Sequence, residues 1–140
     1  MSLGIYLERT VHKSYDNKKT FIEEKEELYS DNITHNLSIM AKKADLYSVL
    51  WKPYELNPNY NIGEKDYKAQ YKFEEENIVL AKELITTLEA GINLLESKPE
   101  YFKKFNPDNN WGNYKNLLNF SKSYLKACKQ YPKAIVITSR

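Results

Sequence analysis

The sequence predicts an α+β fold in which three helices pack on a small, mainly antiparallel sheet formed by the N-terminal and C-terminal strands. Alternating apolar residues open the chain, a β-branched run closes it, and three segments between them carry apolar residues every three or four positions. Amphipathic helices must bury their apolar stripes against another layer, and the sheet provides that layer. The length of 140 residues fits a single domain, residues 1–140.

Three segments are predicted to be strands. Residues 3–11 alternate apolar and polar side chains, and residues 134–138 are rich in β-branched side chains. We expect these two strands to pair as neighbours. Turn residues at positions 16–19 lead into a more exposed strand over residues 21–29, although the glutamates at positions 23, 24, 26 and 27 are equally compatible with a helix.

Three further segments are predicted to be helices. The first covers residues 37–51, is capped by Thr34 or Asn36 and ends at Pro53. The second covers residues 78–95, between an acidic first turn at positions 74–76 and Pro99, and the third covers residues 114–128. Residues 51–71 are rich in turn formers and are predicted to be a long loop, which makes them a candidate rim for a functional site.

Composition excludes several classes of protein. The net charge of +2 provides no strong attraction to nucleic acid or to an anionic membrane. A lone cysteine, Cys128, rules out an internal disulfide, and two isolated histidines do not suggest a metal site. No signal peptide or membrane span is apparent, so we expect a cytoplasmic protein without a cofactor. The 12 Tyr residues suit a ligand site or a homodimer interface, although the codon usage of an AT-rich genome is the favoured explanation for them.

The first candidate site stretch precedes the first predicted helix. It contains Asn32, Thr34, His35 and Asn36. Free backbone N–H groups at a helix start attract anions, so these residues are candidates for holding a phosphate or carboxylate. Alternatively, the polar residues only cap the helix while His35 packs against a Tyr or Trp ring.

A second unusual stretch spans residues 106–114 and combines amides with aromatic rings. Trp111 and Tyr114 are candidates for stacking on a base or sugar, with Asn109 and Asn110 to contact its polar edge. Asn106 is a further candidate ligand contact in the same stretch. In the alternative interpretation the asparagines form turns and caps, and Trp111 anchors the core.

The third candidate stretch, residues 50–56, contains Trp51 and Tyr54 beside a lysine. It suits either a ligand contact or a hydrophobic plug, and the plug is favoured because Trp is buried on average. The sequence contains no P-loop, dinucleotide fingerprint, nucleophile elbow or zinc-protease motif. Known catalytic motifs therefore give no support to an enzyme.

The three stretches, at residues 32–41, 50–56 and 106–114, resemble a family of small uncharacterised proteins from bacteriophages and prophage-bearing bacteria, as do residues 131–134 and the final Ser139-Arg140. The family often has Gly where Asn110 stands. The resemblance implies a phage or mobile-element setting, in which small proteins often bind a host component or a nucleotide signal of antiviral defence.

Three hypotheses follow. The first is a binding protein, and more specifically a counter-defence module, that holds a nucleotide-like ligand or a host factor where the three stretches meet. The second is an enzyme acting on a nucleotide or glycosidic bond, with His35 as acid or base. The third is a structural or interaction protein that forms a homodimer through exposed aromatic residues.

Overall fold

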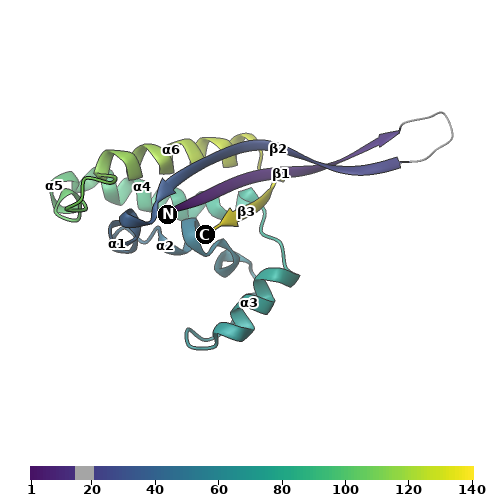
Figure 1. The fold of residues 1–140 in the computed structure, drawn as a ribbon, viewed down its shortest axis with the longest axis horizontal. Coiled ribbons are helices and arrows are strands. Elements are labelled where there is room, and N and C mark those ends of the chain that lie inside the picture. Colours follow the sequence, from purple (N-terminus) through teal and green to yellow (C-terminus); the bar gives the residue numbers. More distant parts are fainter. Residues whose placement is uncertain (15–20) are drawn as a thin grey trace.

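A three-stranded antiparallel sheet forms one layer of the fold (Figure 1). The computed structural model describes residues 1–14 and 21–140, so the turn predicted at positions 16–19 lies outside the described residues. The strands are β1 (Ser2–Ser14), β2 (Phe21–Thr34) and β3 (Ile135–Ser139), in the order β2-β1-β3. The predicted pairing of the two chain ends is confirmed, and the glutamate-rich segment is a strand rather than a helix.

The β1–β2 hairpin is longer than the rest of the sheet. β3 pairs with β1 only between Gly4 and Glu8, whereas the pairing of β1 with β2 continues to Ser14 and Phe21. The register shifts where Leu7 faces Tyr29 and Glu8 faces Glu27. Beyond this irregularity the two strands project from the body as an arm (Figure 1).

Helices form the second layer. The described residues contain six α-helices, α1 (Ser38–Lys43), α2 (Tyr47–Trp51), α3 (Tyr67–Glu76), α4 (Ile85–Ser97), α5 (Pro99–Lys103) and α6 (Tyr114–Gln130), and the 3-10 segments η1 (His35–Leu37), η2 (Pro53–Leu56) and η3 (Ala81–Leu84). α6 packs on β2, and α4 lies beside α6 (Figure 1). The predicted α+β class is confirmed, but three helices are too few.

The core lies between these layers. Leu3, Ile5 and Leu7 of β1 are fully buried, as expected from their alternation. The third predicted helix is confirmed as α6, which buries Leu117 and Tyr124 on its inner face. No helix in the described ranges has the length and apolarity that a membrane crossing requires.

The first predicted helix, over residues 37–51, is interrupted. It divides into η1, α1 and α2, and Asp45 at the break has a φ of 57°. The break allows the fully buried Leu46 to press against Gly91 of α4, where a Cβ atom would collide with the leucine side chain. Close packing between two helices therefore prevails over the local periodicity of the sequence.

The second predicted helix, over residues 78–95, starts later than expected. Val79 accepts a backbone hydrogen bond of 2.9 Å from Val136, and Leu80 forms a β-bridge with Ile135, so this segment is extended beside β3. The predicted loop over residues 51–71 contains η2 and the start of α3. Residues 74–76 end α3 rather than beginning a helix, so the predicted acidic first turn is wrong.

Candidate functional site

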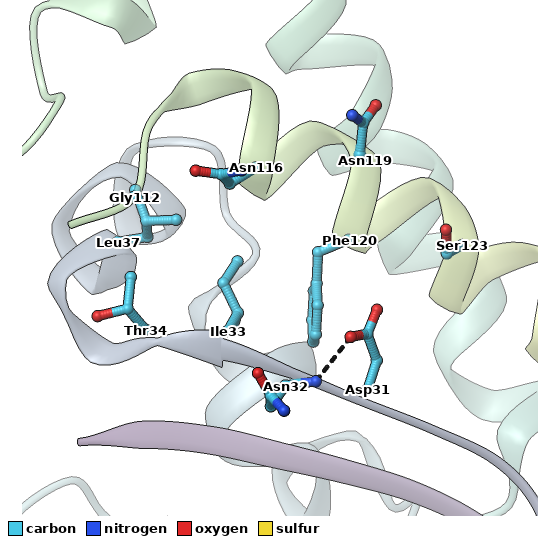
Figure 2. Close-up of a pocket in the computed structure, with 10 residues that line it drawn as sticks. All are labelled: Asp31, Asn32, Ile33, Thr34, Leu37, Gly112, Asn116, Asn119, Phe120 and Ser123. Carbon is cyan, nitrogen blue, oxygen red and sulfur yellow. Dashed lines mark hydrogen bonds between the residues drawn. The ribbon is translucent and has the colours of Figure 1, made fainter. Parts of the chain in front are cut away.

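A groove of about 390 Å³ lies where the end of β2 meets the start of α6 (Figure 2). Its lining comes from both elements and from the loops next to them: Asp31, Asn32, Ile33, Thr34, Leu37, Gly112, Asn116, Asn119, Phe120 and Ser123. Asp31 is the one ionisable residue among these ten. The groove is therefore polar but nearly uncharged.

The β2 side of the groove contributes one carboxylate. Asp31 and Ile33 are two positions apart on the strand, so both face α6, whereas the Asn32 side chain lies on the opposite side of β2 (Figure 2). Asp31 accepts a 2.8 Å hydrogen bond from the backbone N–H of Asn32 through Oδ1. The hydroxyl of Tyr29 lies 3.5 Å from Asp31 Oδ2. Burial and the Asp31 charge together raise the pKa of Tyr29 to about 12, so this phenol stays protonated and can donate.

The α6 side contributes a row of neutral polar groups. Asn113 begins the helix as its N-cap, accepting a 3.0 Å hydrogen bond from the N–H of Asn116. Asn116, Asn119 and Ser123 follow at spacings of three and four, and all three line the groove, with the Asn119 side chain pointing away from β2 (Figure 2). The largely buried ring of Phe120 extends from α6 toward β2, on the side where Asp31 lies (Figure 2).

At Gly112 the second candidate stretch, residues 106–114, closely approaches Thr34 of the first. Its φ of 95° lies in the region that favours glycine, and a Cβ atom there would be 2.7 Å from Thr34 Cγ2. Thr34 itself caps η1 by accepting from the N–H of Asn36 at 3.3 Å. Two of the three predicted stretches, around residues 32–37 and 106–114, therefore meet at this groove.

Trp111 is a surface residue, so the alternative that it anchors the core is wrong. Its side chain is 68% exposed beside Gly112, which lines the groove. Its backbone N–H donates a 3.0 Å hydrogen bond to Oδ1 of Asn109, which fixes the turn. Trp111 is next in sequence to the groove residue Gly112, although it is not itself among the lining residues.

Tyr114 does not join Trp111 in a stacking surface. It is buried, and its hydroxyl donates a 2.7 Å hydrogen bond to the carbonyl of Leu95. Its backbone N–H donates to Asn106 Oδ1 at 2.7 Å. Asn106, Asn109 and Tyr114 therefore support the loop and the helix start, as the structural alternative for this stretch predicts.

His35 is engaged by a tryptophan and is not among the groove residues. The indole Nε1–H of Trp51 donates a 2.8 Å hydrogen bond to His35 Nδ1. Trp51 is buried and also stacks on Tyr47, with ring centroids 5.4 Å apart. The structural alternative for His35, packing against an aromatic ring, is confirmed. The helix that follows His35, whose start is the candidate anion site, is α1, and it has only six residues.

The remaining stretch, with Trp51 and Tyr54, contacts Arg140, the residue that follows β3. Arg140 donates through Nη1 to the Trp51 carbonyl at 2.7 Å and through Nη2 to Glu74 Oε2 at 2.6 Å. Its guanidinium also lies over the ring of Tyr54, 5.9 Å from the centroid. Trp51 and Tyr54 are therefore a buried plug held by Arg140, away from the groove.

Sequence reasoning missed Asp31 and the polar face of α6. The signal was present, because Asn116, Asn119 and Ser123 repeat with helical spacing alongside the apolar stripe of the same helix. Only the packing of β2 on α6 reveals that this polar face borders a groove. Within the described ranges, no group of three or more His, Cys, Asp or Glu residues is arranged to hold a metal ion.

No protein family model, curated protein or solved structure matches this chain. The geometry of the groove is therefore the basis for a functional proposal.

Proposed function

We propose that this protein is a small binding protein whose groove between β2 and α6 holds a neutral polar ring, such as a nucleoside or a sugar. The observation that carries the proposal is that Asn116, Asn119 and Ser123 of α6 line the same groove as Asp31 of β2, with the Phe120 ring between the two elements. Amide and hydroxyl groups donate and accept hydrogen bonds, and a carboxylate accepts them, which suits ring hydroxyls and base edges. Trp111 is exposed and adjoins the groove residue Gly112 in sequence, so we expect its ring to stack on a bound ligand.

The charge of the groove favours a nucleoside over a nucleotide. A phosphate needs cations or converging N–H donors, and the lining contains the Asp31 carboxylate but no Lys or Arg. We therefore expect the base and sugar of a nucleotide-like ligand to provide most of the affinity. The resemblance to phage proteins extends this proposal to a counter-defence module, which would bind such a signal or a host factor inside the infected cell.

The geometry supports binding more than catalysis. The rival hypothesis makes His35 an acid or base, but its Nδ1 is occupied by Trp51 and its side chain is not among those that line the groove. A homodimer has a separate observation in its favour, because Tyr67 and Tyr71 lie one turn apart on α3 and are 70% and 64% exposed. Light scattering coupled to size-exclusion chromatography tests the dimer.

The binding proposal is tested by NMR titration with adenosine, guanosine, cytidine and uridine, their 5′-monophosphates, glucose and N-acetylglucosamine. We expect at least one of these compounds to shift the backbone amides of residues 31–34 and 112–123. A nucleoside should bind at least as tightly as its monophosphate. Shifts elsewhere only, or no shifts with any compound, would refute the proposal.

Two pairs of variants sharpen the test. Trp111→Ala should weaken binding about tenfold, because stacking on an aromatic ring contributes about 1–3 kcal/mol. Tyr67→Ala removes an equally exposed ring from α3 and should leave the affinity unchanged. Asn119→Ala is paired in the same way with Asn93→Ala, which removes an exposed amide from α4. Equal losses in the two members of a pair would contradict the assignment of the site.

A further inference from the structure

The outer edge of β2 runs along the projecting arm. β2 pairs with β1 on one side and is the outermost strand of the sheet on the other. In the arm, from Glu26 outward, β3 no longer extends the sheet, and Figure 1 shows the two strands projecting clear of α4 and α6. An edge strand presents backbone N–H and C=O groups that another extended chain can pair with.

The edge is strongly acidic. Residues 23–27 read Glu-Glu-Lys-Glu-Glu, so five consecutive positions carry four carboxylates and one ammonium group. The neighbouring strand adds charge of both signs, since Arg9 pairs with Glu26 at 2.8 Å while Glu27 faces Glu8. Glu23, Lys25 and Glu27 are exposed on the same face of the arm.

A second copy of this chain is a poor occupant of the edge. If two β2 strands paired antiparallel about Lys25, Glu23 would face Glu27 and Glu24 would face Glu26. Like charges directly opposite one another destabilise a strand pair. Nucleic acid is disfavoured for the same electrostatic reason.

We propose that the β2 edge over residues 22–27 is a docking strand for an extended segment of a different protein that is rich in Lys or Arg. Backbone pairing would supply affinity that does not depend on sequence, and basic side chains of the partner would meet Glu23 and Glu27, with a neutral residue opposite Lys25. Because these charges are exposed, the attraction should weaken as salt is raised.

The probe is a ten-residue synthetic peptide of Val and Thr with Lys at every fourth position, so that lysines lie opposite Glu23 and Glu27 and a neutral residue lies opposite Lys25. It is titrated into the isotopically labelled full chain. We expect amide shifts in β2 over residues 22–27, and affinity that falls about tenfold between 50 and 300 mM salt. A peptide of the same charge with Pro at two central positions should bind at least about fivefold more weakly, because proline cannot donate to a strand ladder.

Two double variants are compared. The arm variant carries Glu23→Lys and Glu27→Lys, and the α4 variant carries Glu89→Lys and Glu96→Lys. Both pairs change the net charge equally, and Glu89 and Glu96 are exposed on α4, where each forms an ion pair with a lysine of α6. The arm variant should reduce affinity at least about tenfold and the α4 variant less than about twofold. Equal losses, or equal binding of the proline peptide, would overturn strand pairing. If the lysine peptide does not bind, the proposal is wrong and the glutamates act only to prevent edge-to-edge aggregation.

Discussion

The indole Nε1–H of Trp51 donates a 2.8 Å hydrogen bond to Nδ1 of His35, joining the end of α2 to the start of η1. The donor belongs to a buried side chain, so its hydrogen bond to water in the unfolded chain must be replaced in the folded one. The histidine that sequence analysis marks as a candidate acid or base therefore has a structural partner.

We expect His35→Phe to lower the free energy of unfolding by about 1–3 kcal/mol, because it leaves the buried Trp51 N–H without its acceptor. Urea denaturation of His35→Phe, Trp51→Phe and the double variant measures the coupling between the two residues. The double variant should be less destabilised than the sum of the single ones. Strict additivity would show that the hydrogen bond contributes nothing.

Gly112→Ala should destabilise the protein by about 1–3 kcal/mol. The φ of 95° strains any L side chain, and the new Cβ would lie 2.7 Å from Thr34 Cγ2. Adding Thr34→Ser removes that methyl group and should recover only part of the loss, since the backbone strain remains. Gly63→Ala is the matched control, because no heavy atom lies within 4 Å of its Cβ position. The unfolding temperatures of the original chain, Gly112→Ala, Gly112→Ala with Thr34→Ser, and Gly63→Ala are compared. An unchanged unfolding temperature for Gly112→Ala would refute the close approach of Gly112 to Thr34.

Two buried tyrosines should respond oppositely to loss of their hydroxyl groups. The Tyr124 hydroxyl is buried and has no hydrogen-bond partner within the described part of the chain, so Tyr124→Phe should be neutral or stabilising. The Tyr114 hydroxyl donates to the Leu95 carbonyl at 2.7 Å, so Tyr114→Phe should cost about 1 kcal/mol. Chemical denaturation gives both values. A large loss for Tyr124→Phe would indicate a partner such as a buried water.

Alkaline pH should destabilise the fold. Burial raises the pKa of the Cys128 thiol to about 12, and burial is also the main cause that raises the pKa values of Tyr29 and Tyr54 to about 12. The folded state therefore favours the protonated forms, and their contribution to stability is complete below the ordinary pKa values of these groups. It declines as pH rises through about 9 to 12.

The measurement is the unfolding temperature between pH 7 and pH 11, compared with that of Cys128→Ala. The variant lacks the thiol and should lose less stability between pH 8 and pH 10 than the original chain. A second readout is thiol modification at pH 8, which should be slow for the native protein and fast in urea, because Cys128 is fully buried. Rapid modification without denaturant would contradict this burial.

Much of the fold follows from local patterns in the sequence. The alternation of Leu3, Ile5 and Leu7 predicts β1, and the apolar spacing of residues 114–128 predicts α6, because each element buries one face in a common core. The sequence does not predict α3, because this helix lacks a buried apolar face. Gln70 is its one buried residue, so it carries no apolar stripe that a sequence pattern could reveal.

The candidate site was predicted only in part. Thr34 and the stretch leading to Trp111 and Gly112 meet at the groove, whereas His35 and Trp51 bond to each other and Tyr54 lies under Arg140. Asparagine residues have the same appearance in a sequence whether they cap a helix or face a ligand. Asn113 and Asn116 illustrate this, since one caps α6 and the other lines the groove.

The sequence by itself determined the α+β class, the pairing of the chain ends and the course of α6, because hydrophobic periodicity is a local property of the chain. The tertiary structure decided where the helices break and which polar residues meet. Leu46 against Gly91 and Thr34 against Gly112 are contacts between residues distant in sequence, and no local pattern encodes such contacts. The groove lined by Asp31 exists because β2 and α6, far apart along the chain, pack together.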